Sequence, residues 1–90
     1  MLKQIHVIFS GQVQGVGFRF TTESIADQLG LVGWVKNIRV GDVEVLAEGQ
    51  EAALKDLVSR LEDHFSGYIE KKQVSWSPAT GEFKDFGIES

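Results

Sequence analysis

Apolar and polar residues alternate over the first ten positions, with Ile5, Val7 and Phe9 on one side of the pattern. A period of two is typical of a strand with one buried face, so residues 2–10 are expected to form a strand. After Gly17 the period lengthens to that of a helix. The apolar-face positions there are Phe18, Thr22, Ile25, Ala26 and Leu29. This spacing predicts a helix over residues 18–29, which Gly30 ends.

The middle of the chain predicts a hairpin followed by a second helix. Residues 31–39 are expected to form a strand, and Gly41-Asp42 is a pair typical of a turn. Val43, Val45 and Ala47 then alternate with acidic residues in a third strand, so residues 33–48 form the hairpin. Residues 50–65 predict an amphipathic helix. Its apolar stripe consists of Leu54, Leu57, Val58, Leu61 and Phe65.

The last third of the chain is less regular. Residues 69–76 predict a strand with Lys71-Lys72 near a sheet edge, residues 77–84 an irregular loop, and Phe86 and Ile88 a short final strand. The order of elements predicts one α+β domain over residues 1–90. It is a ferredoxin-like βαββαβ sandwich, with two helices on one face of a four- to five-stranded antiparallel-rich sheet. Enzymes, regulatory domains and RNA binders share this architecture, so it fixes no function.

Composition narrows the chemistry. The chain has no cysteine, which excludes disulfides, thiolate metal ligands and a cysteine nucleophile. Its net charge of −4 disfavours general binding to nucleic acid or anionic membranes. No 18-residue apolar stretch is available for a membrane helix. We therefore expect a cytoplasmic protein with a small-molecule ligand, and a monomer is the simplest expectation.

The segment between the first strand and first helix suits a small anion. Gly11, Gly15 and Gly17 let the backbone turn sharply, and the first N–H groups of the helix lack intrahelical partners. The helix dipole adds partial positive charge at the same point. Arg19 is a cation in that first turn, and no acidic residue precedes Glu23. A bound anion would resolve this electrostatic conflict, whereas an ordinary glycine-rich turn with a solvated arginine is the structural alternative.

Two segments resemble the signatures of the acylphosphatase family. The first is Gly11-Gln-Val-Gln-Gly-Val-Gly-Phe-Arg19; the second is Gly33-Trp-Val-Lys-Asn37 with Gly41-Asp-Val43 and Gly49. The resemblance implies a hydrolase that acts on acyl phosphates, with inorganic phosphate as product and competitive inhibitor. It implies that Arg19 and Asn37 are catalytic, Asn37 orienting the attacking water. The phosphoryl oxygens would be held by Arg19 and the loop amides, at Gln14, Gly15, Val16, Gly17, Phe18 and Arg19.

Neither a metal nor a cofactor is expected, because no carboxylates cluster near the loop and the resemblance implies none. His6 is expected on the sheet face opposite the core, and His64 at the end of the second helix. Glu44 and Glu48 share a strand face, which we interpret as solvated. Trp34, Trp76 and the six phenylalanines are interpreted mainly as core, and Phe18 beside Arg19 is also a candidate for the wall of the site.

Three other functions stay open at this stage. One is a non-catalytic module of the same fold that binds a small anion and regulates a partner. Another is a domain of the kind fused to carbamoyl-phosphate-handling maturation proteins, which the length of 90 residues disfavours. The third is an RNA-recognition domain, which the acidic charge and the lack of an aromatic sheet motif disfavour.

Overall fold

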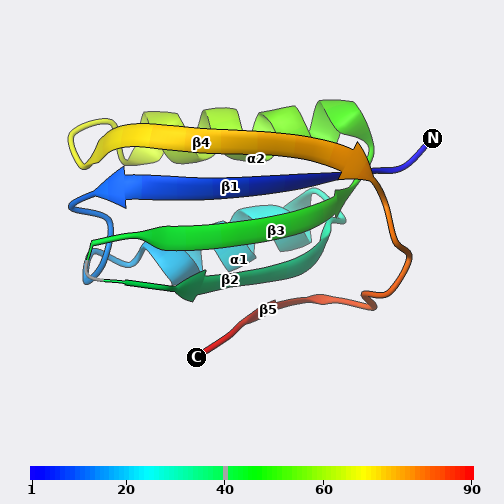
Figure 1. Cartoon of the computed structure of the whole chain (residues 1–90), viewed down its shortest axis with the longest axis horizontal. Helices are drawn as coiled ribbons and strands as arrows, with labels where there is room; N and C mark the ends of the chain where they lie inside the picture. Colours follow the sequence, from blue (N-terminus) through cyan, green and yellow to red (C-terminus); the bar gives the residue numbers. More distant parts are fainter. Residues whose placement is uncertain (40) are drawn as a thin grey trace.

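The computed structural model describes residues 1–39 and 41–90 and contains each expected helix and strand (Figure 1). The predicted bounds differ from the observed ones mainly at the strand ends. The elements in chain order are β1 (Lys3–Gly11), α1 (Phe18–Gln28), β2 (Val32–Asn37), β3 (Val43–Gly49), α2 (Glu51–His64), β4 (Ile69–Pro78) and β5 (Phe86–Ile88).

The strands form one sheet in the order β4-β1-β3-β2-β5. The pairs β1–β4, β1–β3 and β2–β3 are antiparallel, whereas β2–β5 is parallel. The sheet is therefore mixed rather than simply antiparallel-rich, although the predicted ferredoxin-like fold is confirmed. The parallel pair arises because the stretch after β4 runs along one end of the sheet and delivers β5 beside β2 (Figure 1).

Both helices lie on the same face of the sheet (Figure 1), and the core fills the space between them and the strands. The alternation seen in the sequence puts one side of each central strand into this core, so the predicted buried faces are confirmed. The strand contributions are Ile5, Val7, Phe9, Val35, Val43, Val45 and Ala47. The helix contributions are Phe18, Ile25, Ala26, Leu54, Leu57, Val58 and Leu61.

Three aromatic residues interpreted as core lie outside it. Trp34 is half-buried on the sheet face opposite the helices, because it alternates along β2 with the buried Gly33 and Val35. Phe20 is 70% exposed because it lies two positions after the buried Phe18, which turns it about 200° around the helix and away from the sheet. Trp76 is 42% exposed because it lies on β4, at the edge of the sheet. The interpretation is correct for the buried phenylalanines, which are Phe9, Phe18, Phe65 and Phe86.

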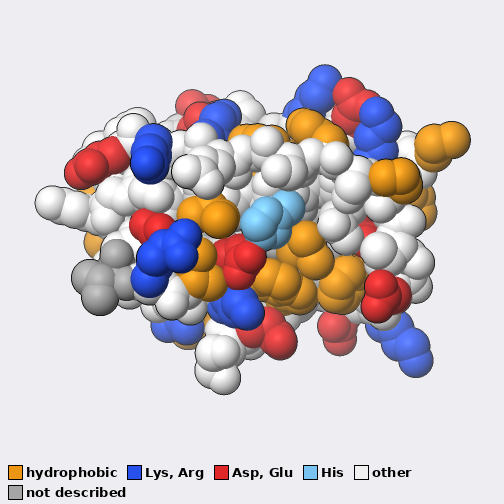
Figure 2. All heavy atoms as spheres, viewed as in Figure 1, with side chains coloured by type: hydrophobic (Ala, Val, Ile, Leu, Met, Phe, Trp, Pro, Cys, Tyr) orange, Lys and Arg blue, Asp and Glu red, His pale blue; other side chains and the backbone are white. Residues whose placement is uncertain are grey.

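The opposite face of the sheet carries a small polar cluster instead of a second layer of helices. Figure 2 shows this face, where acidic, basic and hydrophobic side chains lie beside a histidine. His6 Nε2 lies 2.6 Å from Glu44 Oε2, which confirms that His6 faces away from the core. Lys36 Nζ lies 4.0 Å from Glu44 Oε1 and 4.9 Å from the centre of the Trp34 ring.

Glu48 is buried, so its interpretation as a solvated residue is wrong. Only 3% of it is exposed, and its carboxylate accepts hydrogen bonds from the Gln4 amide (2.7 Å), the Thr80 N–H (2.9 Å) and hydroxyl (2.9 Å) and the Gly81 N–H (3.1 Å). Burial raises the pKa of Glu48, but these hydrogen bonds outweigh it and lower the pKa below the ordinary value of 4.5. The residue thus fastens the stretch after β4 to the sheet.

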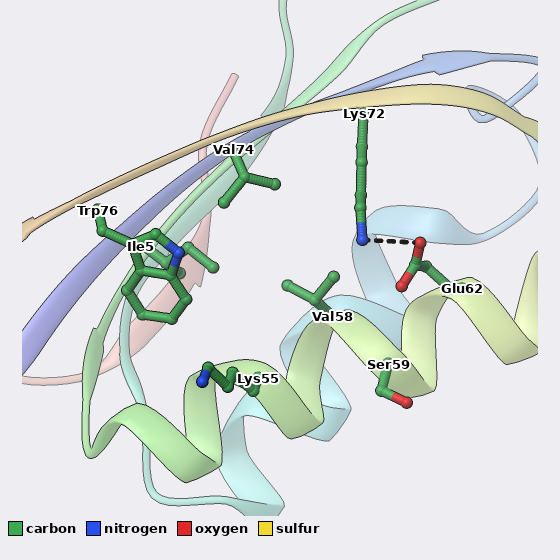
Figure 3. Close-up of a pocket in the computed structure, with 8 residues that line it drawn as sticks. All are labelled: Ile5, Lys55, Val58, Ser59, Glu62, Lys72, Val74 and Trp76. Carbon is green, nitrogen blue, oxygen red and sulfur yellow. Dashed lines mark ion pairs between the residues drawn. The ribbon is translucent and has the colours of Figure 1, made fainter.

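A groove opens between β4 and α2 at the edge of the sheet (Figure 3). Ile5, Val58, Val74 and Trp76 form its apolar part. An ion pair of 2.8 Å between Lys72 and Glu62 crosses one end of the groove. The predicted edge position of the two adjacent lysines is confirmed.

Replacing Glu48 by Gln is expected to destabilise the fold by about 1–3 kcal/mol near neutral pH, since charge-assisted hydrogen bonds in a buried setting are lost. The native pKa of Glu48 is lowered, so this stabilisation is complete above the unfolded value of 4.5 and disappears as the pH falls through the native pKa. Urea unfolding of parent and variant should show a difference near pH 7 that shrinks in acid.

The matched control is Glu82→Gln, because Glu82 lies in the same stretch with an exposed side chain. It should leave stability unchanged at both pH values. A Glu48→Gln effect that does not vary with pH would show that the charge of Glu48 contributes nothing.

Candidate active site

The loop between β1 and α1 is anchored by a buried valine, and two glycines determine its backbone conformation. Val13 is fully buried, which fixes the loop against the core. Gly15 has φ 79° and Gly17 has φ 81°, the left-handed conformation that residues with a side chain adopt only at a cost. A Cβ at either glycine would meet nothing within 4 Å, so conformation and not space requires glycine here.

Helix α1 begins with its N–H groups free of side-chain caps. Gly17 is the N-cap residue, no side chain in the described part of the chain caps the helix, and no acidic residue lies in the first turn. The Thr21 N–H donates to the Gly17 carbonyl (3.0 Å), so the N–H groups of the three residues between them precede the helical ladder. This helix start presents donors and the positive end of the dipole, and its own first turn contains no acidic side chain to oppose them.

Arg19 and Asn37 line the same cavity, which has a volume of about 240 Å³. The two residues are distant in sequence, and they meet because α1 and β2 pack against each other. Arg19 makes no ion pair with any residue that the structure describes. The full lining consists of Val13, Gly15, Gly17, Phe18, Arg19, Phe20 and Asn37.

Asn37 is the last residue of β2, and its side-chain oxygen is buried. Within residues 1–39 and 41–90, Asn37 Oδ1 has no hydrogen-bond partner. A buried carbonyl without a donor costs about 1–3 kcal/mol, so such atoms are uncommon outside functional sites. The atom is available to a donor that enters the cavity.

Gln14 joins the loop to the hairpin that carries Asn37. Its side-chain amide donates to the carbonyl oxygens of Arg39 (2.5 Å) and Asp42 (2.7 Å). An ion pair of 2.9 Å between Arg39 Nε and Asp42 Oδ2 braces the same turn. Only the backbone of Gln14 was predicted to bind the anion, because no periodicity in the sequence signals the partners of its side chain.

Of the predicted phosphate-binding residues, only some border the cavity. Gly15, Gly17, Phe18 and Arg19 do so, whereas Gln14 and Val16 are outside the lining formed by the described residues. Phe20 also lines the cavity, although it was not among the predicted site residues. The signal was present, since Phe20 lies off the apolar face of its helix and beside Arg19.

The two histidines lie away from this cavity. His6 pairs with Glu44 on the open sheet face, and His64 ends α2 and contacts Phe65. Among residues 1–39 and 41–90, no three acidic or histidine side chains are grouped so as to hold a metal ion.

Comparison with known proteins decides the family. The acylphosphatase family model matches residues 5–88. The chain belongs to the acylphosphatase family. It is similar to an acylphosphatase of Caldanaerobacter subterraneus subsp. tengcongensis, with 35% identity over 98% of this chain and 99% of the relative. An acylphosphatase of Marinobacter nauticus is 43% identical over 90% of this chain and 89% of the relative.

A solved structure supports the same assignment. The crystal structure of acylphosphatase from Bacillus subtilis superposes with a TM-score of 0.90 at 40% identity, and the match covers 100% of both chains. The resemblance seen in the two sequence signatures is therefore confirmed at the level of the whole family domain.

Replacing Gly17 by Ala should cost about 1–2 kcal/mol of stability, because an alanine is strained in the left-handed conformation. The same change moves the loop N–H groups, so we expect the Kd for inorganic phosphate to rise as well. Chemical denaturation and phosphate titration by calorimetry measure the two effects.

Gly30→Ala is the matched control. Gly30 has φ 69°, its Cβ would also meet nothing within 4 Å, and it lies beyond the opposite end of α1. It should lose similar stability and keep its phosphate affinity. If both variants bound phosphate as the parent does, the loop conformation would have no part in anion binding.

Proposed function

We propose that this chain is a hydrolase that converts acyl phosphates to a carboxylate and inorganic phosphate by direct attack of water. The observation that carries the proposal is the meeting of Arg19 and Asn37 in one cavity at the start of α1. Membership of the acylphosphatase family supports the same reaction.

Arg19 and the backbone N–H groups of residues 14–19 bind the phosphoryl oxygens in this proposal. The guanidinium has a planar fork that donates two parallel hydrogen bonds to phosphate. The N–H groups at the start of α1 supply further donors whose positions are fixed before the substrate arrives. Together they stabilise the charge on the equatorial oxygens during phosphoryl transfer.

Asn37 holds the attacking water in line with the phosphorus. Its buried Oδ1 accepts a hydrogen bond from that water, which satisfies the otherwise unpartnered carbonyl. The water oxygen forms a bond to phosphorus while the bond from phosphorus to the acyl oxygen breaks, and the electron pair leaves with the carboxylate. The water proton passes to a phosphate oxygen.

A carboxylate is a good leaving group, so this reaction needs no protein acid. No histidine, aspartate or glutamate belongs to the cavity lining formed by the described residues, consistent with transfer of the proton to the substrate. We propose that the enzyme uses no metal or cofactor and that inorganic phosphate competes with the substrate. The alternative of a non-catalytic anion-binding module uses the same site without turnover.

The monomeric state and cytoplasmic location belong to the same proposal. Neither helix described by the structure has the length and apolar character required to cross a membrane.

Purified protein is expected to release phosphate from acetyl phosphate and benzoyl phosphate with EDTA present and no added metal. The rate should fall competitively as inorganic phosphate is added. Phosphate binding without turnover above background would instead support the non-catalytic module.

Arg19→Lys and Asn37→Ala should fail in different ways. A lysine is a point charge that cannot reproduce the bidentate fork, so we expect weaker phosphate binding and a loss of about 100-fold in kcat/KM. Asn37→Ala should lower kcat by about 100-fold or more while the Kd for phosphate stays within about twofold. Steady-state kinetics and phosphate titration of both variants measure this contrast.

Two results would contradict the roles proposed for Arg19 and Asn37. Near-normal kinetics in Arg19→Lys would rule out the bidentate contact. A loss of phosphate affinity in Asn37→Ala equal to its loss of activity would make Asn37 a binding residue.

A further inference from the structure

Phe20 is the exposed aromatic residue that borders the catalytic cavity. It is 70% exposed, yet it lines the same cavity as Arg19 and Asn37. Single exposed apolar residues are common and need no explanation by themselves. This one differs because a substrate held at Arg19 would place its second half within reach of the ring.

The residues that line the cavity differ in their exposure to solvent, and this difference indicates how a bound substrate is oriented. Asn37 Oδ1 is buried, Arg19 is partly exposed and Phe20 is largely in solvent. In phosphoryl transfer the attacking and leaving oxygens lie roughly in line on opposite sides of the phosphorus. A water on the buried Asn37 therefore directs the acyl group toward the mouth of the cavity, where Phe20 stands.

The lining also limits what the acyl group can meet there. Arg19 and Asn37 are the hydrogen-bonding side chains of the described lining, and the proposed reaction uses both. A polar acyl group finds no further side-chain donor or acceptor among these residues. An apolar or aromatic acyl group can cover the Phe20 ring and remove apolar surface from water.

We infer that Phe20 forms an acyl-group subsite that favours aromatic and bulky apolar acyl phosphates over acetyl or carbamoyl phosphate. This inference rests on the proposed function, because it assigns the half of the substrate that the phosphate site does not hold. Phe20 contacts the acyl substituent and takes no part in bond breaking.

Binding of non-hydrolysable isosteres tests the subsite without turnover. Phenacylphosphonate and acetonylphosphonate replace the bridging oxygen of benzoyl and acetyl phosphate by a methylene group. Calorimetry should show that the parent protein binds phenacylphosphonate about tenfold more tightly. Phe20→Ala should reduce that preference to within about twofold by weakening the phenacyl compound alone, and Phe20→Leu should keep part of it.

Trp76→Ala is the matched control, since it removes an exposed aromatic residue from β4 at a distance from the cavity, and it should keep the full preference. An equal loss for both ligands in Phe20→Ala, or no preference in the parent, would overturn the subsite. Hydrolysis of benzoyl and acetyl phosphate is measured separately. A parent that hydrolyses neither overturns the proposed function, whereas the phosphonate preference still decides the role of Phe20.

Discussion

The side-chain amide of Gln14 connects two segments that the proposed site needs together. The loop between β1 and α1 contains the proposed anion site, and Asn37 ends β2. The central strand β3 separates β1 from β2 in the sheet. Gln14 crosses from the loop to the carbonyl oxygens of the turn between β2 and β3. Its neighbour Val13 is buried in the core. Val13 thus anchors the loop to the core, and Gln14 fixes the position of the loop relative to the hairpin.

The strand β3 links this site to the opposite end of the sheet. It starts at Val43, which pairs with Asn37, and near its end lies Glu48, which pairs with Val32. The proposed chemistry and the buried carboxylate that holds the stretch after β4 are thus at opposite ends of one strand. The two ends differ in their hydrogen bonding. At one end the side-chain oxygen of Asn37 has no partner among the residues that the structure describes, whereas at the other end the carboxylate of Glu48 accepts four hydrogen bonds.

Local patterns predicted the helices, the strands and the fold, because each buried face repeats at the period of its element. They also led to Arg19, whose charge conflicts with a helix start. The role of Asn37 came from family resemblance alone, since nothing local distinguishes an asparagine at a strand end. The burial of Glu48 was missed because its donors are distant in sequence: Gln4 lies 44 residues before it, and Thr80 and Gly81 lie 32 and 33 residues after it in an irregular stretch. Phe20 was misread because residue type was weighed above helical position.

The ten residues of β4 leave one side of the sheet's backbone without a neighbouring strand. Such a border can template pairing between molecules and begin aggregation. Here the adjacent Lys71 and Lys72 lie on opposite faces of the strand, and Lys72 is paired with Glu62. An incoming chain would therefore have to desolvate a charged group on either face. Pro78 at the far end has no N–H to offer. Both ends of this edge strand therefore carry a feature that disfavours pairing with the backbone of another chain.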